Sequence, residues 1–115
     1  MLKKLRTIIY HVSDIAVAKD WYRKATGIDP YFDEPFYAGF DINGYELGLD
    51  PDTLSVVPGN QTVSYWAVDD TDAAAKKLAA IGGHLVQPGT NVGGEIFVAI
   101  VGDPFGNHIG LIEGA

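Results

Sequence analysis

Two stretches of this sequence follow the same pattern at a spacing of 56 residues. Each has a run rich in β-branched and aromatic residues, then an aspartate, apolar residues at helical spacing, and a glycine. The aspartates are Asp14 and Asp70, and the glycines are Gly27 and Gly83. An aspartate at this place can accept hydrogen bonds from the first turn of a helix, and glycine can adopt the left-handed conformation that ends one. The repeat therefore predicts two similar units, each containing one helix.

Each unit is predicted to contain four strands besides its helix. One strand precedes the helix, a short extended segment follows it, and a hairpin ends the unit. In the first unit the hairpin turns at Asn43-Gly44, the strongest two-residue hairpin signal. The predicted strands are 6–12, 29–32, 36–42 and 45–49 in the first unit, and 62–68, 84–87, 95–101 and 108–112 in the second.

These elements predict an α+β fold made of two βαβββ modules. With 115 residues the chain has the length of one domain. We expect that domain to consist of modules at about 1–50 and 61–115, joined by a linker at 51–60 that contains Pro51, Pro58 and Gly59. A module of this size buries too little surface to be stable alone. The two modules are therefore expected to share a sheet or a core with each other or with a second chain.

The charge composition argues against one class of function. The chain has 8 Lys and Arg against 15 Asp and Glu, a formal net charge of −7, and beyond Lys24 its basic side chains are Lys76 and Lys77. Phosphate backbones are bound by clustered Lys and Arg, so no nucleic-acid partner is expected. The chain has no cysteine, no apolar run long enough to span a membrane and no secretory signal pattern. We expect a cytoplasmic protein without disulfides or membrane attachment.

Two motifs carry a resemblance to a known family. The pattern V-S-D…W-Y…G spans residues 12–27, and the ending D-P-F-G-N-H-I-G-L-I-E spans residues 103–113. Together with the paired βαβββ modules, they resemble the vicinal oxygen chelate superfamily, which includes glyoxalase, bleomycin-resistance proteins and extradiol dioxygenases. The resemblance implies curved mixed sheets that form a cup, with the helices outside and a small-molecule ligand inside. It also implies a homodimer.

The resemblance further implies where a catalytic metal would bind. Family enzymes usually hold a divalent metal with four side chains on the strands that line the cup. Those positions correspond to Thr7, Glu46, Val63 and Gly110 in this sequence. Glu46 is the one good ligand among them, whereas metal sites of this kind keep about three protein ligands. We therefore expect neither a metal nor another cofactor.

The alternative is a divalent metal at a relocated site. Alternation along the strands puts His11, Asp41, Glu46 and His108 on the faces that would line the cup. Carboxylates and imidazoles are suitable ligands for such an ion. If a metal binds, we expect Glu46 to hold it together with His11 and His108.

The same alternation separates a ligand-binding face from a core face. For the strand at 95–101, two choices stay open on the ligand-binding face: Phe97 with Ala99, or Ile96 with Val98. The residues expected in the core are Ile8, Tyr10, Phe40, Leu47, Leu49, Trp66, Ile109 and Leu111. The predicted ligand-binding residues are Thr7, Ile9, His11, Tyr37, Asp41, Glu46, Val63, Tyr65, Phe97, His108 and Gly110.

Two acidic residues are central to the predicted chemistry. Asp41 and Glu46 are cross-strand neighbours of like charge, so if both are buried one should have a raised pKa and could serve as a general base or a cation anchor. With His11 they form the set of candidate catalytic residues. The alternative is two solvated carboxylates at the base of a hairpin. Glycines on this face, such as Gly39 and Gly48, would either leave room for a ligand or relieve sheet curvature.

Three functions fit these residues. The first is a metal-free protein that binds a small, partly aromatic or cationic molecule, as drug-resistance members of the family do. The second is a lyase- or isomerase-type enzyme that uses Glu46 or Asp41 as its base, with His11 or a tyrosine as acid. The third is a structural or regulatory dimer whose cup is filled. The sequence does not decide between an enzyme and a binding protein.

Overall fold

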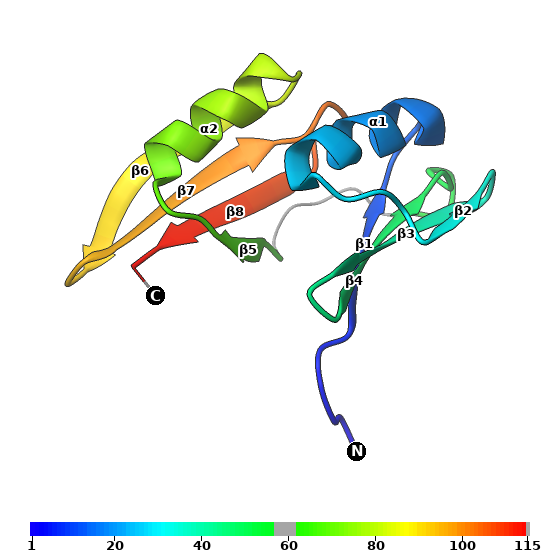
Figure 1. Cartoon of the computed structure of the whole chain (residues 1–115), viewed down its shortest axis with the longest axis horizontal. Helices are drawn as coiled ribbons and strands as arrows, with labels where there is room; N and C mark the ends of the chain where they lie inside the picture. Colours follow the sequence, from blue (N-terminus) through cyan, green and yellow to red (C-terminus); the bar gives the residue numbers. More distant parts are fainter. Residues whose placement is uncertain (57–61, 115) are drawn as a thin grey trace. The chain divides into compact units, whose positions relative to one another are not determined.

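Each half of the chain folds into a four-stranded sheet with one helix packed on it (Figure 1). The computed structural model describes residues 1–56 and 62–114, and the chain divides into a first unit, Met1–Val57, and a second unit, Pro58–Ala115. Both units have the order strand, helix, strand, strand, strand. The predicted α+β fold of two βαβββ modules is therefore confirmed. The predicted linker at 51–60 lies partly outside the described residues.

The first unit has strand order β1-β4-β3-β2. Strand β1 pairs in parallel with β4, whereas β3 pairs antiparallel with both β4 and β2. The hairpin of β3 and β4 therefore lies beside β1, the strand that begins the unit. The elements are β1 (Thr7–His11), α1 (Ile15–Thr26), β2 (Phe32–Glu34), β3 (Tyr37–Ile42) and β4 (Tyr45–Asp50).

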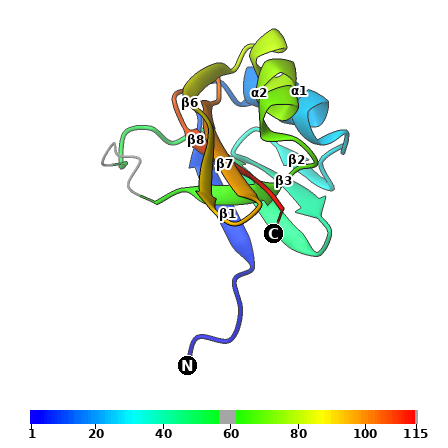
Figure 2. The same cartoon turned by 90° about the vertical axis from the view of Figure 1, so that its left-hand side faces the viewer.

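The second unit repeats this topology as β5-β8-β7-β6, and Figure 2 shows β6 and β7 side by side. Strand β6 is longer than the predicted 84–87, because its pairing with β7 continues to Gly93, with three irregularities in register along the way. The elements are β5 (Ser64–Ala67), α2 (Thr71–Ala80), β6 (His84–Gly93), β7 (Ile96–Gly102) and β8 (His108–Glu113).

Both helices begin at the predicted aspartates. Asp14 Oδ1 accepts hydrogen bonds from the backbone N–H groups of Ala16 and Val17, each at 3.1 Å, and Asp70 Oδ1 accepts one from Ala73 at 2.9 Å. These bonds satisfy donors that a helix cannot pair internally. The helices have 12 and 10 residues, and in the described part of the chain none is long and apolar enough to cross a membrane.

Most residues predicted to lie on the core face of the sheets are buried. On the side that each helix covers, six of the predicted core residues are buried: Tyr10, Phe40, Leu47, Leu49, Ile109 and Leu111. Trp66 is half-buried. Ile8 is 39% exposed, so its predicted core position is wrong. It lies near the start of β1, an edge strand, whereas Tyr10 further along the same strand is buried against the ring of Tyr22 on α1.

Candidate functional site

The face of the first sheet opposite α1 contains the densest group of predicted site residues. Pairing of Thr7 and Asp41 with Glu46, and of Ile9 and Gly39 with Gly48, fixes which side chains share this face. Ile9 is 47% exposed there. We call it the Glu46 face; it consists of Thr7, Ile9, Phe32, Tyr37, Gly39, Asp41, Glu46 and Gly48.

Two tyrosine hydroxyls hold the side chain of Glu46. Tyr31 donates its hydroxyl proton to Oε1 of Glu46, and Tyr37 donates its proton to Oε2. Tyr37 begins β3, one residue after the predicted start of this strand at 36. Tyr31 lies just before β2 and was not predicted to belong to the site. Each carboxylate oxygen thus receives one phenolic hydrogen bond, which fixes the orientation of the carboxylate.

The same two rings lie over the glycines of the Glu46 face. A Cβ atom built on Gly48 would lie 2.7 Å from Cζ of Tyr37, and one built on Gly39 would lie 3.2 Å from Cε1 of Tyr31. At Gly48 a side chain would force the ring to move, whereas at Gly39 the ring would have to give by only a few tenths of an ångström. The space above these glycines is therefore filled by tyrosine rings, which argues against the first of the two alternatives, room for a ligand.

The hydrogen bonds make Glu46 a stronger acid. The hydroxyls of Tyr31 and then Tyr37 lower its pKa below the ordinary value, and the nearby charge of Arg6 adds to this, while burial opposes it. The pKa of Tyr31 is raised, mainly by its bond to Glu46, and that of Tyr37 is raised by burial and by the same partner. Glu46 is therefore a carboxylate and both phenols are protonated at neutral pH.

Asp41 is a solvated carboxylate at the base of the hairpin, which is one of the two alternatives that the sequence leaves open. Its Oδ1 accepts a hydrogen bond of 2.8 Å from the backbone N–H of Gly44, and the residue is exposed. The bond stabilises the predicted hairpin turn, where Asn43 has φ of 51° and Gly44 has φ of 93°. Asp41 and Glu46 are therefore not buried together.

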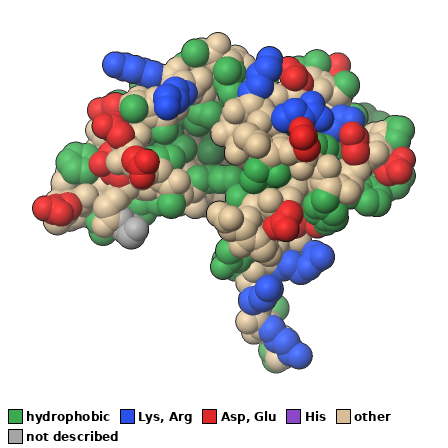
Figure 3. All heavy atoms as spheres, in the orientation of Figure 1, with side chains coloured by type: hydrophobic (Ala, Val, Ile, Leu, Met, Phe, Trp, Pro, Cys, Tyr) green, Lys and Arg blue, Asp and Glu red, His purple; other side chains and the backbone are tan. Residues whose placement is uncertain are grey.

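Aromatic side chains continue the Glu46 face beyond the tyrosines. The ring of Phe32 lies 6.1 Å from that of Phe36 and 6.2 Å from that of Tyr37, measured between centroids. Tyr31 is 62% exposed and Phe36 is 66% exposed. In Figure 3, hydrophobic and acidic side chains lie close together on the surface of the first unit. Small-molecule sites are lined mainly by apolar and aromatic side chains with a few polar groups, and this face contains both kinds.

His11 is not part of the group around Glu46. It lies at the opposite end of β1 from Thr7, where it pairs with Asp50. Its Nδ1 atom is 2.7 Å from the backbone carbonyl oxygen of Asp52, which can only accept a hydrogen bond, so Nδ1 carries the proton. The predicted combination of His11 with Glu46 in catalysis therefore does not form within this unit.

The second unit shows one parallel to the first and one correction. Tyr65 pairs with Gly110, and a Cβ atom on Gly110 would lie 2.5 Å from Cδ1 of the Tyr65 ring. Phe97 pairs with Glu113 and shares the face of the buried Ala99, so its predicted place on the ligand-binding face is wrong. The turn after β7 pairs Gly102 with His108 and so selects the other choice, Ile96 with Val98.

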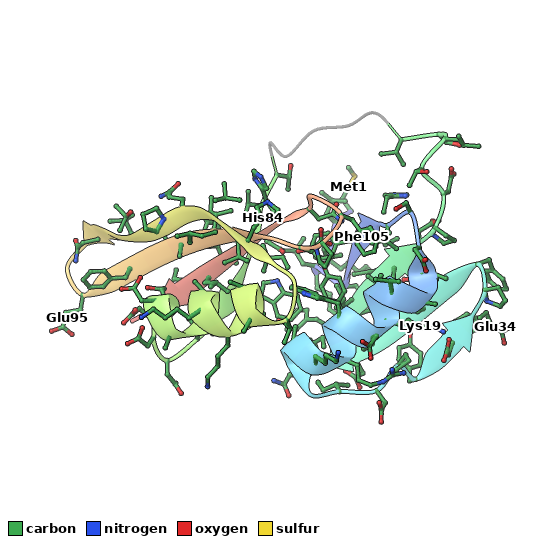
Figure 4. All side chains as sticks on the ribbon, turned by 90° about the horizontal axis from the view of Figure 1, so that it is seen from above. Met1, Lys19, Glu34, His84, Glu95 and Phe105 are labelled. Atoms are coloured by element: carbon green, nitrogen blue, oxygen red, sulfur yellow. The ribbon has the colours of Figure 1, made fainter. Side chains whose placement is uncertain are left out.

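The remaining predicted residues of the second unit lie on the side away from α2 or at the start of its sheet. His108 is half-buried and shares a face with Gly110, while Val63 is half-buried just before β5. A ring covers a glycine here as well, because Nδ1 of His84 would lie 2.9 Å from a Cβ atom on Gly102. Figure 4 shows His84 on the side of the ribbon away from α2.

Sequence and structure comparisons place the chain among known proteins. The family model described as the Glyoxalase/Bleomycin resistance protein/Dioxygenase superfamily matches residues 4–111. The chain belongs to this superfamily. A search of curated proteins found no match.

Solved structures of the superfamily share the fold. A glyoxalase-related enzyme from Fulvimarina pelagi has a TM-score of 0.80 at 19% identity, with 97% of this chain and 88% of that chain covered. A family enzyme from Burkholderia phytofirmans PsJN has a TM-score of 0.82 at 17% identity, with 96% and 98% covered. Lactoylglutathione lyase from Agrobacterium tumefaciens has a TM-score of 0.75 at 16% identity, with 98% and 95% covered. At these identities the likeness supports the fold alone.

The four positions that the superfamily implies for a metal do not provide suitable donors. In the first unit, both oxygens of Glu46 accept phenolic protons, and Oγ1 of Thr7 accepts a hydrogen bond of 3.0 Å from Arg6. In the second unit, Val63 and Gly110 have no donor atom in their side chains. Across residues 1–56 and 62–114, no three or more His, Asp or Glu side chains are grouped so that they could hold a metal ion. The donor set does not fit a divalent ion.

Proposed function

We propose that this superfamily member binds a small, partly aromatic or cationic molecule on the Glu46 face of its first unit, without a metal ion. One observation carries the proposal: an ionised carboxylate is held in place by two phenols on a surface rich in exposed rings. The carboxylate provides a fixed negative charge, and the rings of Phe32 and Phe36 provide flat apolar contact. A cation attached to an aromatic ring would use both.

The chemistry of Glu46 favours binding over catalysis. An effective general base has a pKa near the working pH, whereas the tyrosine hydroxyls shift the pKa of Glu46 downward. Both oxygens are also already hydrogen-bonded. His11, the acid in the enzymatic alternative, lies at the far end of β1. The tyrosines that could act as the acid instead, Tyr31 and Tyr37, already donate their protons to Glu46, and their pKa values are raised. A proton-transfer reaction would therefore start from a weak base beside two weak acids.

Ligand-induced stabilisation of the full chain tests this proposal. We expect members of a library of aromatic cations to raise the melting temperature, because a ligand that binds the native state stabilises it by mass action. The effect should disappear in Glu46→Gln and persist in the charge-matched control Asp20→Asn, whose carboxylate lies on α1 beside Lys24. Turnover of any such compound that is lost in Glu46→Gln with the fold intact would contradict the proposal.

We also propose that the chain forms a homodimer. The edge strands β1 and β5 expose large apolar side chains, with Ile8 at 39% and Tyr65 at 49%. Exposed edges of this kind are commonly covered by association, and two-fold dimers are the commonest arrangement. Sedimentation at micromolar concentration should give twice the mass of the chain. A single species with the mass of one chain would contradict the proposal.

A further inference from the structure

The proton arrangement around Glu46 restricts which ligands its cluster can recognise. A tyrosine hydroxyl has one proton, and both Tyr31 and Tyr37 donate theirs to the carboxylate. The oxygen atoms that face outward from this cluster then carry lone pairs alone. The cluster of Tyr31, Glu46 and Tyr37 is therefore negatively charged and can only accept hydrogen bonds.

We infer that this cluster selects ligands by their N–H groups, binding a primary ammonium or amidinium attached to a flat ring in preference to a quaternary ammonium. The inference rests on the proposed function and specifies the class of ligand. Hydrogen bonds to charged groups are among the strongest polar contacts in proteins. A ligand with several N–H donors can satisfy the remaining lone pairs of Glu46 and of the two phenol oxygens, whereas an alcohol has one donor and a carboxylate has none.

The position of the rings explains why a quaternary ammonium should bind less well. Such ions are recognised by the faces of several aromatic rings arranged as a cage. Here the hydroxyl end of the Tyr37 ring lies over Gly48, and that of the Tyr31 ring lies over Gly39. The hydroxyl ends of both rings converge on the carboxylate, so the cluster presents its oxygen edge. A methylated nitrogen has no proton to donate to that edge.

Arg6 provides a competing cation from the chain itself. Its charge contributes to lowering the pKa of Glu46, and its guanidinium donates to Oγ1 of the neighbouring Thr7 at 3.0 Å. The backbone of Arg6 is also fixed, because its carbonyl oxygen accepts a 2.8 Å hydrogen bond from the N–H of Glu46. A ligand cation must bind against this positive charge. Arg6→Gln should therefore strengthen cation binding, the opposite of the effect of Glu46→Gln.

Titrations of the full chain with three matched probes test the inference. The probes are 2-phenylethylammonium, its N,N,N-trimethyl derivative and 2-phenylethanol, which share one ring and differ in charge and N–H donors. Backbone amide chemical shifts should move around Glu46, and we expect the ammonium to bind about 10-fold tighter than either other probe, the equivalent of one charge-assisted hydrogen bond. Glu46→Gln should remove most of this preference, Arg6→Gln should increase ammonium affinity about 2- to 5-fold, and Asp20→Asn should change neither.

The outcomes separate this inference from the proposed function. Equal or tighter binding of the trimethyl probe or of the alcohol at the Glu46 face would overturn the N–H selection while leaving the binding function in place. If none of the probes shifts amides on this face and the library screen also finds no ligand, both proposals fail. Retained ammonium preference in a folded Glu46→Gln variant would overturn the assignment of the cluster.

Discussion

Replacing Gly48 with alanine should displace Tyr37 from Glu46. The added Cβ would lie 2.7 Å from Cζ and 2.9 Å from Cε1 of the Tyr37 ring, closer than carbon atoms approach without repulsion. Gly48 is buried in the middle of β4 and has an ordinary strand conformation, so its backbone accepts alanine. The ring of Tyr37 must therefore move, and its hydroxyl loses the carboxylate.

The size of this effect follows from three contributions. A hydrogen bond to a charged group contributes about 1.5–3 kcal/mol, which we halve because Tyr37 and Glu46 are only half-buried. Overpacking adds about 1 kcal/mol, and replacing glycine by alanine in a strand returns about 0.5–1 kcal/mol. The expected loss of unfolding free energy is about 1–2 kcal/mol, which lowers the melting temperature by roughly 4–8 °C.

Urea denaturation followed by circular dichroism measures this loss, with Gly39→Ala as the matched control. Its Cβ would lie 3.2 Å from Tyr31, whose ring is 62% exposed and can move aside, so we expect a change within about 0.5 kcal/mol. In a Tyr37→Ala background the cost of Gly48→Ala should largely vanish. A cost that persists undiminished there, or a Gly48→Ala protein as stable as the wild type, would refute the reasoning.

Four further outcomes follow from contacts in the two units. The pKa values of Tyr31 and Tyr37 are raised above 10, so the stability that these phenols contribute is complete below pH 10 and is lost as the pH rises through the raised values. Phenolate absorbance should show two tyrosines that titrate late, and one fewer in Tyr31→Phe or in Tyr37→Phe. Glu113 Oε1 accepts from N and Oγ1 of Thr71 at 2.8 and 3.0 Å, so Glu113→Ala should cost about 1–2 kcal/mol in urea denaturation, and an unchanged midpoint would contradict this. Asp103 is fully buried and accepts three hydrogen bonds within its turn, so Asp103→Ala should cost about 3 kcal/mol, with a cost below about 1 kcal/mol as the contrary result. Protein purified without a histidine tag should contain less than about 0.1 divalent transition metal per chain, whereas a stoichiometric, tightly held ion would contradict the donor analysis.

Local patterns predicted the elements of the fold because each element depends on nearby residues. The aspartates that cap the helices act within one turn, and Asn43-Gly44 forms its hairpin without distant help. Alternation then placed the predicted first-unit residues around Glu46 on one face. These features can be predicted without knowing which strands pair across the sheet.

The parts that the sequence did not predict depend on register and on irregular backbone. Tyr31 precedes β2, and strict alternation from Phe32 would turn it toward the helix side, yet its ring reaches over Gly39 to Glu46. Its backbone N–H donates to the carbonyl oxygen of Gly39 at 2.9 Å, which holds the segment beside β3. The face on which Phe97 lies depends on the register between β7 and β8, which the sequence does not determine.

The metal positions illustrate what a family resemblance adds. Counting along the motifs singled out Glu46 from four positions, and the structure shows two phenols on its oxygens. The tyrosines could not be assigned to this role from spacing, because a carboxylate–phenol contact is made by side chains from three segments. Glycines on the same face were the usable signal: a glycine in a strand interior often marks the close approach of another group.

Direct titration of the Glu46 side-chain carboxyl by NMR tests the central claim that two phenols hold an ionised anchor on this face. The account predicts a pKa below the ordinary 4.5, with the associated stability present above about pH 4.5 and lost as pH falls through the lowered value. Replacing both Tyr31 and Tyr37 with phenylalanine should return the pKa to its ordinary range. A wild-type pKa at or above 4.5, or one that the double variant leaves unchanged, would contradict the account.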